Sequence, residues 1–147
     1  MDKREAILVR LLAIYRTVDG VATVARNKQV ANDWNWPALL LLDADEEAEE
    51  AALGRGRPPT GLARVTMTPE TYLILGELPE NVGTELNRYR ARIVKAVLTD
   101  AELLTIVGTN GQIAYRGCAT SLSRAGEIIG DIGLEFAITY VLNPADL

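Results

Sequence analysis

Hydrophobic and polar side chains alternate along the last stretch of the chain, residues 127–143. From Ile132 to Leu142 every second residue is large and apolar, and the other face, from Asp131 to Asn143, includes Asp131, Gly133 and Glu135, with Val141 as its exception. Because side chains of a β-strand point alternately to its two faces, this period of two predicts a strand with one face in the core and one toward solvent. Strands of this kind are typical of antiparallel sheets.

The length of this predicted strand suggests a second property. About sixteen residues at roughly 3.3 Å per residue would extend about 53 Å, whereas a compact chain of this size has a diameter of about 38 Å. We therefore expect either that the strand bends, at Gly130 and Gly133, or that its first part pairs with another molecule. The second outcome would indicate a protein that assembles.

The rest of the chain carries helical and strand-like patterns. Apolar residues three and four positions apart predict two main helices, and Asp2 is placed to cap the first. The apolar run before Asp43 predicts a strand buried on both faces, and Pro69 predicts a bend, a break or an edge position in its own strand. The expected helices cover residues 2–17 and 82–99, with further helical turns at 100–107, and the other expected strands cover 21–26, 37–43, 62–75 and 112–123.

These elements together predict an α+β fold, with a mainly antiparallel sheet, two main helices packed on it and a long C-terminal strand. The length of 147 residues suits one domain, residues 1–147. Within that domain, the stretch from about 44 to 61 changes from acidic to basic and becomes rich in Gly and Pro. We expect a mobile loop there.

The composition argues against several classes of function. The chain has no histidine and one cysteine, Cys118, so the commonest general base is missing and a structural zinc site lacks ligands. Cys118 is expected to be a small packed side chain rather than a nucleophile. The net charge of −5 disfavours binding of duplex DNA on the outer surface. No apolar run is long enough for a membrane helix. The N-terminal stretch contains acidic residues and is not followed by a small-residue cleavage site, which argues against a signal peptide.

One acidic cluster resembles a catalytic site. Asp43, Asp45 and Glu46 directly follow the predicted buried strand, and carboxylates at a strand end can hold magnesium for phosphate chemistry. The acidic run continues to Glu50, however, which is typical of a solvated loop. A metal-dependent phosphoesterase therefore remains an alternative function. Residues 54–57 lack the spacing of a phosphate-binding loop. No cofactor is expected.

Two groups of residues are candidates for contacts with partners. Trp34 and Trp36 lie beside a proline and could form a docking hot spot, or they could cover the end of the sheet. Arg88, Arg92 and Lys95 recur along the outer face of the second main helix. That face is either simply solvated or a basic stripe that contacts an acidic neighbour.

Three stretches of the chain resemble small tail-region proteins of tailed phages and prophages. They are V-G-T-E-L-N-R-Y-R-A-R-I-V-K-A-V-L-T-D at 82–100, G-T-N-G-Q-I-A-Y-R-G-C-A-T at 108–120 and F-A-I-T-Y-V-L-N-P-A-D-L at 136–147. The order of elements is similar to that of the lambda-type tail terminators, also called tail completion or minor tail proteins. The likeness covers most of the chain, and its motifs are structural rather than catalytic.

This resemblance implies a non-enzymatic virion protein at the head-proximal end of the tail, assembled in the host cytoplasm. Six copies would form a ring that caps the tail tube, ends its polymerisation and joins tail to head. The partners would be the tail tube protein and the head-side connector protein, with DNA passing through the lumen without specific binding and no contact with a membrane. Arg55 and Arg57 would suit an arm that faces the lumen or a neighbouring copy. A head–tail connector, or neck protein, is the alternative within the same class.

Overall fold

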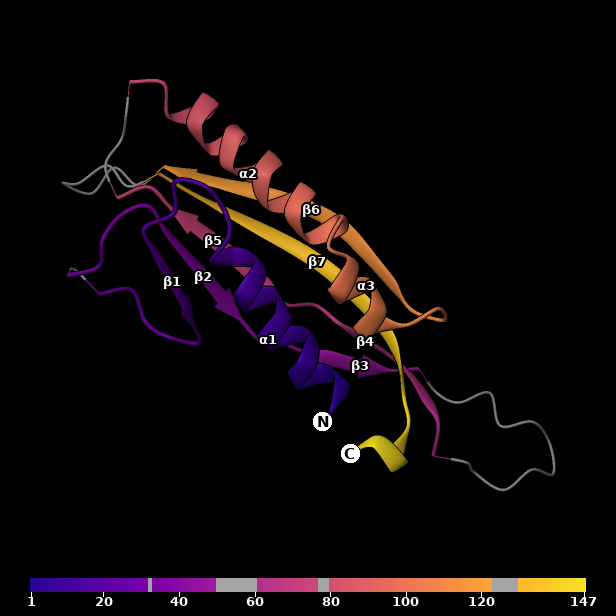
Figure 1. Ribbon diagram of the computed structural model, residues 1–147. Coiled ribbons are helices and arrows are strands. Elements are labelled where there is room, and N and C mark those ends of the chain that lie inside the picture. The colour runs from indigo at the N-terminus through magenta and orange to yellow at the C-terminus, as the bar shows by residue number, and fades with distance from the viewer. Residues whose placement is uncertain (32, 50–60, 77–79, 123–129) are drawn as a thin grey trace.

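The computed structural model describes residues 1–31, 33–49, 61–76, 80–122 and 130–147 (Figure 1). It contains three α-helices and a mostly antiparallel sheet, so the predicted α+β fold with a long C-terminal strand is confirmed. In chain order the elements are α1 (Lys3–Tyr15), β1 (Thr23–Arg26), β2 (Ala38–Leu42), β3 (Glu46–Ala48), β4 (Ala63–Met67), β5 (Glu70–Ile74), α2 (Val82–Leu98), α3 (Ala101–Val107), β6 (Gln112–Leu122), β7 (Gly130–Leu142) and a short 3-10 helix, Pro144–Asp146.

The sheet is built around β7. One edge of β7 pairs with β6, and the other edge pairs first with β5 and then with β4. β2 and β3 continue the sheet beyond β5 and β4, and β1 joins β2 in parallel. The β4–β5 segment therefore behaves as one strand interrupted at Thr68 and Pro69. Both pieces pair on two sides, so Pro69 marks an interruption and not a sheet edge.

The length of β7 does not require a partner molecule. Residues 131–135 pair with β5, residues 138–142 pair with β4, and β6 follows the opposite edge from Gly130 to Thr139. The expectation that the first part of the strand pairs with another copy is therefore wrong for residues 130–142. The physical reason is that β6 and the interrupted β4–β5 strand are long enough to match β7, which makes the sheet elongated (Figure 1). Residues 127–129 lie outside the described part of the chain.

A second difference concerns the acidic stretch after β2. The expected loop begins with a short strand, β3, which pairs antiparallel with β4. An acidic segment can pair in this way because the pairing uses only backbone groups, while the side chains point out of the plane of the sheet. Glu46 accepts a hydrogen bond from the Tyr140 hydroxyl and forms an ion pair with Arg4 at 3.2 Å. This contact anchors the start of the stretch to β7 and α1.

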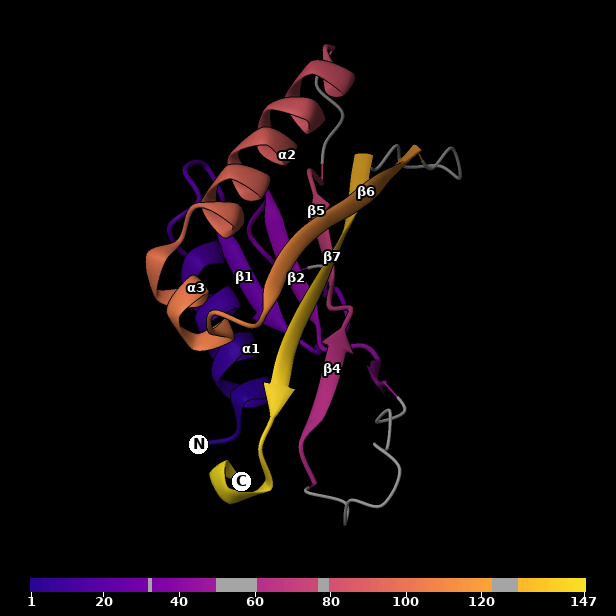
Figure 2. The same ribbon diagram turned by 90° about the vertical axis from the view of Figure 1, so that its right-hand side faces the viewer.

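All three helices lie on one face of the sheet (Figure 2). The apolar face of β7 points toward them, as the alternation predicted, and its large side chains are almost completely buried. These side chains are Ile132, Leu134, Phe136, Ile138 and Tyr140. Asp2 caps α1 by accepting a hydrogen bond from the backbone N–H of Arg4 at 3.2 Å. No helix in the described ranges is long and apolar enough to cross a bilayer.

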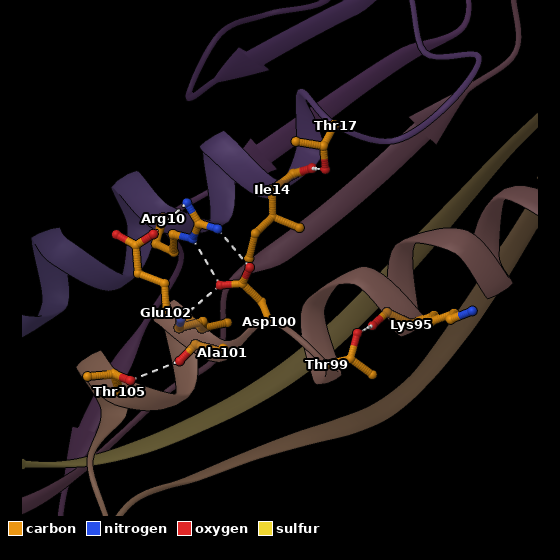
Figure 3. A network of polar contacts seen from close by, with 10 residues as sticks. Arg10, Ile14, Thr17, Lys95, Thr99, Asp100, Ala101, Glu102 and Thr105 are labelled. Carbon is orange, nitrogen blue, oxygen red and sulfur yellow. Dashed lines mark hydrogen bonds and ion pairs between the residues drawn. The ribbon is translucent and has the colours of Figure 1, made fainter.

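A polar junction fixes α1 against α3 (Figure 3). The guanidinium of Arg10 donates two hydrogen bonds to the Asp100 carboxylate, at 2.9 and 2.7 Å, and forms an ion pair with Glu102 at 2.9 Å. Asp100 also accepts from the backbone N–H of Leu103 at 2.8 Å, so it caps α3 as well. The Asp100 carboxylate thus caps the start of α3 and also links it to α1.

Candidate interaction surfaces

The sheet face opposite the helices carries a groove of about 590 Å³. Its lining comes from three neighbouring strands, which are β5, β7 and β6. The residues that border it are Glu70, Tyr72, residues 116–121, Asp131 and residues 133–135. The β7 residues that face this groove are the polar and small ones that alternate with the buried apolar residues of the strand.

The strand registers explain why there is a hollow at this place. Tyr72 of β5, Gly133 of β7 and Ala119 of β6 lie in one row across the sheet. Gly133 has no side chain, and a Cβ added there would lie 3.0 Å from the Tyr72 ring, so the ring lies against the glycine. In the adjacent row, Gly117 also lacks a side chain and sits at a bulge, with φ of +144°. Small residues on β6 and β7 therefore form the floor.

Carboxylates surround this floor. Glu70 lies directly opposite Glu135. Asp131 precedes Gly133 by two residues and lies on the same face of the sheet. Like charges directly opposite each other in an antiparallel pair are destabilising. None of the three carboxylates takes part in an ion pair among the residues that the structure describes. With Arg116 as the cationic lining residue, the groove has a net negative charge.

Two ionisable groups of the groove have shifted pKa values. Partial burial raises the pKa of the Asp131 carboxyl above its usual value, because removal from water penalises the charged form. The Tyr72 hydroxyl donates a hydrogen bond to Glu70 at 2.9 Å, and this bond and partial burial raise the pKa of Tyr72. The negative charges of Glu70 and Asp131 add to the shift of Tyr72, whereas the shift of Asp131 comes from burial alone.

Sequence reasoning missed this groove. The signal was present in part, because the alternation placed Asp131, Gly133 and Glu135 on one face of the last strand. The contribution of Glu70 and Tyr72 depends on which strand pairs with β7 and in which register. Cys118 was expected to be packed, and this is wrong, since it is exposed on the edge strand β6.

Asp43 and Glu46, two of the three carboxylates considered for the alternative metal site, form ion pairs. Arg26 binds Asp43 through two hydrogen bonds of 2.8 Å and binds Glu5 through two of 2.9 Å. The hydrogen bonds from Arg26 lower the pKa of both carboxyls. Glu46 points to Arg4 and Tyr140, so the carboxylates of this stretch are directed to different cationic partners. Over the described ranges, no three acidic, Cys or His side chains converge as metal ligands would.

The basic residues of α2 are divided between the protein and solvent. Arg88 forms an ion pair with Glu85 at 3.0 Å. Arg92 donates to the carbonyl oxygen of Asp19 at 3.1 Å and lies over the Tyr89 ring. Lys95 is exposed on the same helix.

The tryptophan pair lies beside the sheet end. The rings of Trp34 and Trp36 are 6.4 Å apart, and Trp36 lies against Gly76, where a Cβ would collide with the indole. Gly76 has φ of +81°, which also favours glycine. Trp36 therefore covers the chain directly after β5. Arg55 and Arg57 lie outside the described residues.

Comparison with known proteins places the fold. No protein-family model matches the chain, and no curated protein sequence does. Among solved structures, a chain from the virion of the native gene transfer agent particle is similar, with a TM-score of 0.50 and 13% identity. The similarity covers 92% of this chain and 90% of that chain. At this identity the likeness concerns the fold, and it extends over nearly the whole of both chains.

Proposed function

We propose that this protein is a structural component of a tailed-phage virion and that it acts as the tail terminator. In this role six copies form a ring at the head-proximal end of the tail tube. The ring stops polymerisation of the tube protein and presents a surface to the head-side connector protein. DNA passes through the lumen without specific binding.

One observation carries the proposal, namely the fold shared over nearly the full length with a chain of a gene transfer agent virion. The resemblance of residues 82–100, 108–120 and 136–147 to small tail-region proteins, and the order of elements, which is similar to that of the tail terminators, point in the same direction. Because one fold can serve many functions, the fold alone indicates the class of protein and not its position in the particle.

The surfaces of the chain are compatible with a ring. A closed ring uses heterologous contacts, in which one patch meets a different patch on the next copy. The negative groove on the open sheet face and the cationic residues elsewhere on the chain differ in this way. The phosphoesterase alternative has no support from the geometry, since Asp43 and Glu46 are bound to arginines.

Deletion of the gene from its phage or prophage tests the proposal. We expect tails of uncontrolled, excessive length that carry no heads, visible by negative-stain electron microscopy, and rescue by the intact gene in trans. Tails of normal length beside DNA-filled heads would instead identify a neck protein that joins the two. Normal joined particles would refute a role in tail completion.

A further inference from the structure

We propose that the outer edge of β6 binds the outer edge of β3 in a second copy of this chain, so that the sheets of neighbouring copies join into one. The inference rests on the proposed role in a virion ring and specifies how its copies meet. Both edges belong to the described part of the chain, and they lie on opposite sides of the sheet, with β7 and β4 between them.

β6 is the one long strand whose outer edge has no partner among the described residues. It pairs with β7 over residues 112–122, and no other described strand pairs with it. Arg116 and residues 118–121 are exposed. Proteins usually protect a free edge by keeping the strand very short or by placing lysine, proline or a bulge on it. Residues 117–121 follow the bulge at Arg116 and have none of these protections, which indicates that another strand covers them.

β3 has the second free edge. Its residues pair with β4 on one side, and the pairing continues through the hydrogen bond of 2.9 Å from the Glu49 backbone N–H to a carbonyl oxygen of β4. No described strand pairs with the other side. Side chains alternate along a strand, and Glu46 points to the helix side, where it contacts Arg4 and Tyr140. Glu47 and Glu49 therefore point to the open face.

The two edges carry opposite charges on the same face of the sheet. Arg116 lines the groove on the open face, to which Glu47 and Glu49 also point. None of these three side chains forms an ion pair with another described residue. Opposite charges across a strand pair are stabilising and like charges are destabilising, so β6 pairs better with β3 than either edge pairs with itself. The edge of β1 carries Arg26 as its only charged residue and does not offer this complement.

The strand directions allow this pairing between copies in the same orientation. From β6 through β7 and β4 to β3, each neighbouring pair is antiparallel, so β3 runs opposite to β6. The β3 of a second copy in the same orientation is therefore antiparallel to the β6 that it meets. The helices all lie on one face, so they stay on one face of the joined sheet (Figure 2). Repetition of this head-to-tail contact forms a ring or a filament, and not a two-fold dimer.

The faces of the two strands restrict the register. Cys118 lies opposite Leu134, whose side chain is buried on the helix side, so Cys118 belongs to that side as well. On β3 the helix-side residues are Glu46 and Ala48. Ala48 is the small one of the two and is exposed, so we place it opposite Cys118 of the neighbouring copy.

This register also brings the opposite charges together. It sets Glu49 opposite Gly117 and next to Arg116 of the neighbouring copy. Glu47 then lies opposite Ala119, and the glycine and the alanine leave room for the two long carboxylate side chains on the open face. A shift of two residues along β6, away from the bulge, would move both glutamates away from Arg116.

The native cysteine provides the first test. In an antiparallel pair, opposite Cα atoms are about 4.5–5.5 Å apart, a separation that a disulfide can span. We expect the purified Ala48→Cys chain, under mild oxidation, to form a ladder of disulfide-linked oligomers on a non-reducing gel, because each copy then links to two neighbours. Two controls should not give this ladder: Ala91→Cys, at an exposed alanine of α2, and Ala48→Cys combined with Cys118→Ser.

Charge reversal provides a second test that does not depend on the exact register. We expect Arg116→Glu and Glu49→Arg, each alone, to weaken association in sedimentation velocity at least about tenfold, as the replacement of one attractive pair by a repulsive one would cause. An equimolar mixture of the two variants should associate like wild type, because every contact between unlike chains again joins opposite charges. Arg16→Glu and Glu80→Arg, at exposed positions outside both edges, are the matched controls and should associate like wild type.

Three results would overturn the inference: a wild-type chain that stays monomeric over the whole concentration series, Ala48→Cys chains that form no ladder, or charge-reversed variants that associate like wild type. Ala48→Cys chains linked only as dimers through Cys118 would show instead that β6 pairs with itself. If wild type forms rings and none of the variants behaves as expected, the edge pairing fails while the proposed virion role stands. If the ladder forms and deletion of the gene leaves normal joined particles, the proposed role fails while the edge pairing stands.

Discussion

Replacement of Glu135 by glutamine is expected to stabilise the folded chain. Glu135 lies directly opposite Glu70 on the open face of the sheet. The Cβ atoms of such a pair are about 5 Å apart, so we take a carboxylate separation of about 6 Å. At that separation, in water with a dielectric constant of about 80, Coulomb repulsion amounts to about 332/(80 × 6), or about 0.7 kcal/mol. This value lies within the range of roughly 0.2–1 kcal/mol measured for cross-strand pairs. Removal of one charge should recover about 0.5 kcal/mol.

Urea unfolding at low and high salt provides the assay. We expect the gain for Glu135→Gln to be largest at about 0.01 M salt and to decrease strongly near 1 M, because the screening length falls from about 30 Å to about 3 Å. Glu70→Gln tests the same pair but also alters the hydrogen bond from the Tyr72 hydroxyl, so Glu135→Gln is the cleaner change. The double variant should be no more stable than the better single variant. Glu80→Gln, at an exposed site outside the groove, should have no such salt-dependent effect.

The result has meaning beyond stability. If Glu135→Gln is neutral or destabilising at low salt, or if the two single changes add fully, the carboxylates do not repel each other and the reasoning on the groove is refuted.

Three further predictions concern the framework around the groove. Asp100→Ala should lower the free energy of unfolding by about 2 kcal/mol, measured in urea, because it removes a helix cap and a charged hydrogen-bond partner together, and Asp100→Asn should retain about half. Phe136→Ala should cost about 3–5 kcal/mol in the same assay, because the side chain is fully buried on the central strand. Arg26→Met should make the free energy of unfolding depend less on pH in the acid range. Arg26 lowers the pKa of Glu5 and Asp43, so in the wild type these ion pairs stabilise the folded chain above the usual carboxyl pKa values, and this stabilisation is lost as pH falls below about 4. Thermal melts from pH 7 to pH 3 would contradict this if both chains lost stability in parallel.

The periodic features of the sequence predicted most of the fold. The alternation in residues 130–142 identified the central strand, and the apolar run of residues 38–42 identified the buried strand beside β5. These predictions succeeded because one face or both faces of the strand lie in the core, so the pattern records burial directly. The short strand β3 was missed because its acidic side chains show no apolar alternation, although its backbone can pair like that of any other strand.

The groove could not be predicted in the same way. It depends on which residues of three strands share a row, and rows are set by register. Glu70 and Glu135 are distant in sequence, and no local pattern shows that they meet. The strand-length argument failed for a related reason: the extent of β7 was compared with an average compact shape, whereas the pairing with β6 and β4–β5 makes this sheet elongated.

The two faces of β7 differ in how well their residues suit the surroundings that the fold gives them. On the helix side the large side chains from Ile132 to Tyr140 are apolar, buried and consistent with their neighbours, and Leu142 at the end of the strand is half-buried. On the open side three unfavourable choices coincide within five residues: like charges across a strand pair, a glycine within the strand, and a carboxylate whose ionisation is opposed by burial. Natural sequences are locally consistent except where function requires otherwise. Among the described residues Glu70 accepts a hydrogen bond from the Tyr72 hydroxyl, and no cationic side chain forms an ion pair with Glu70, Asp131 or Glu135, so this face keeps negative charge that the fold itself does not require.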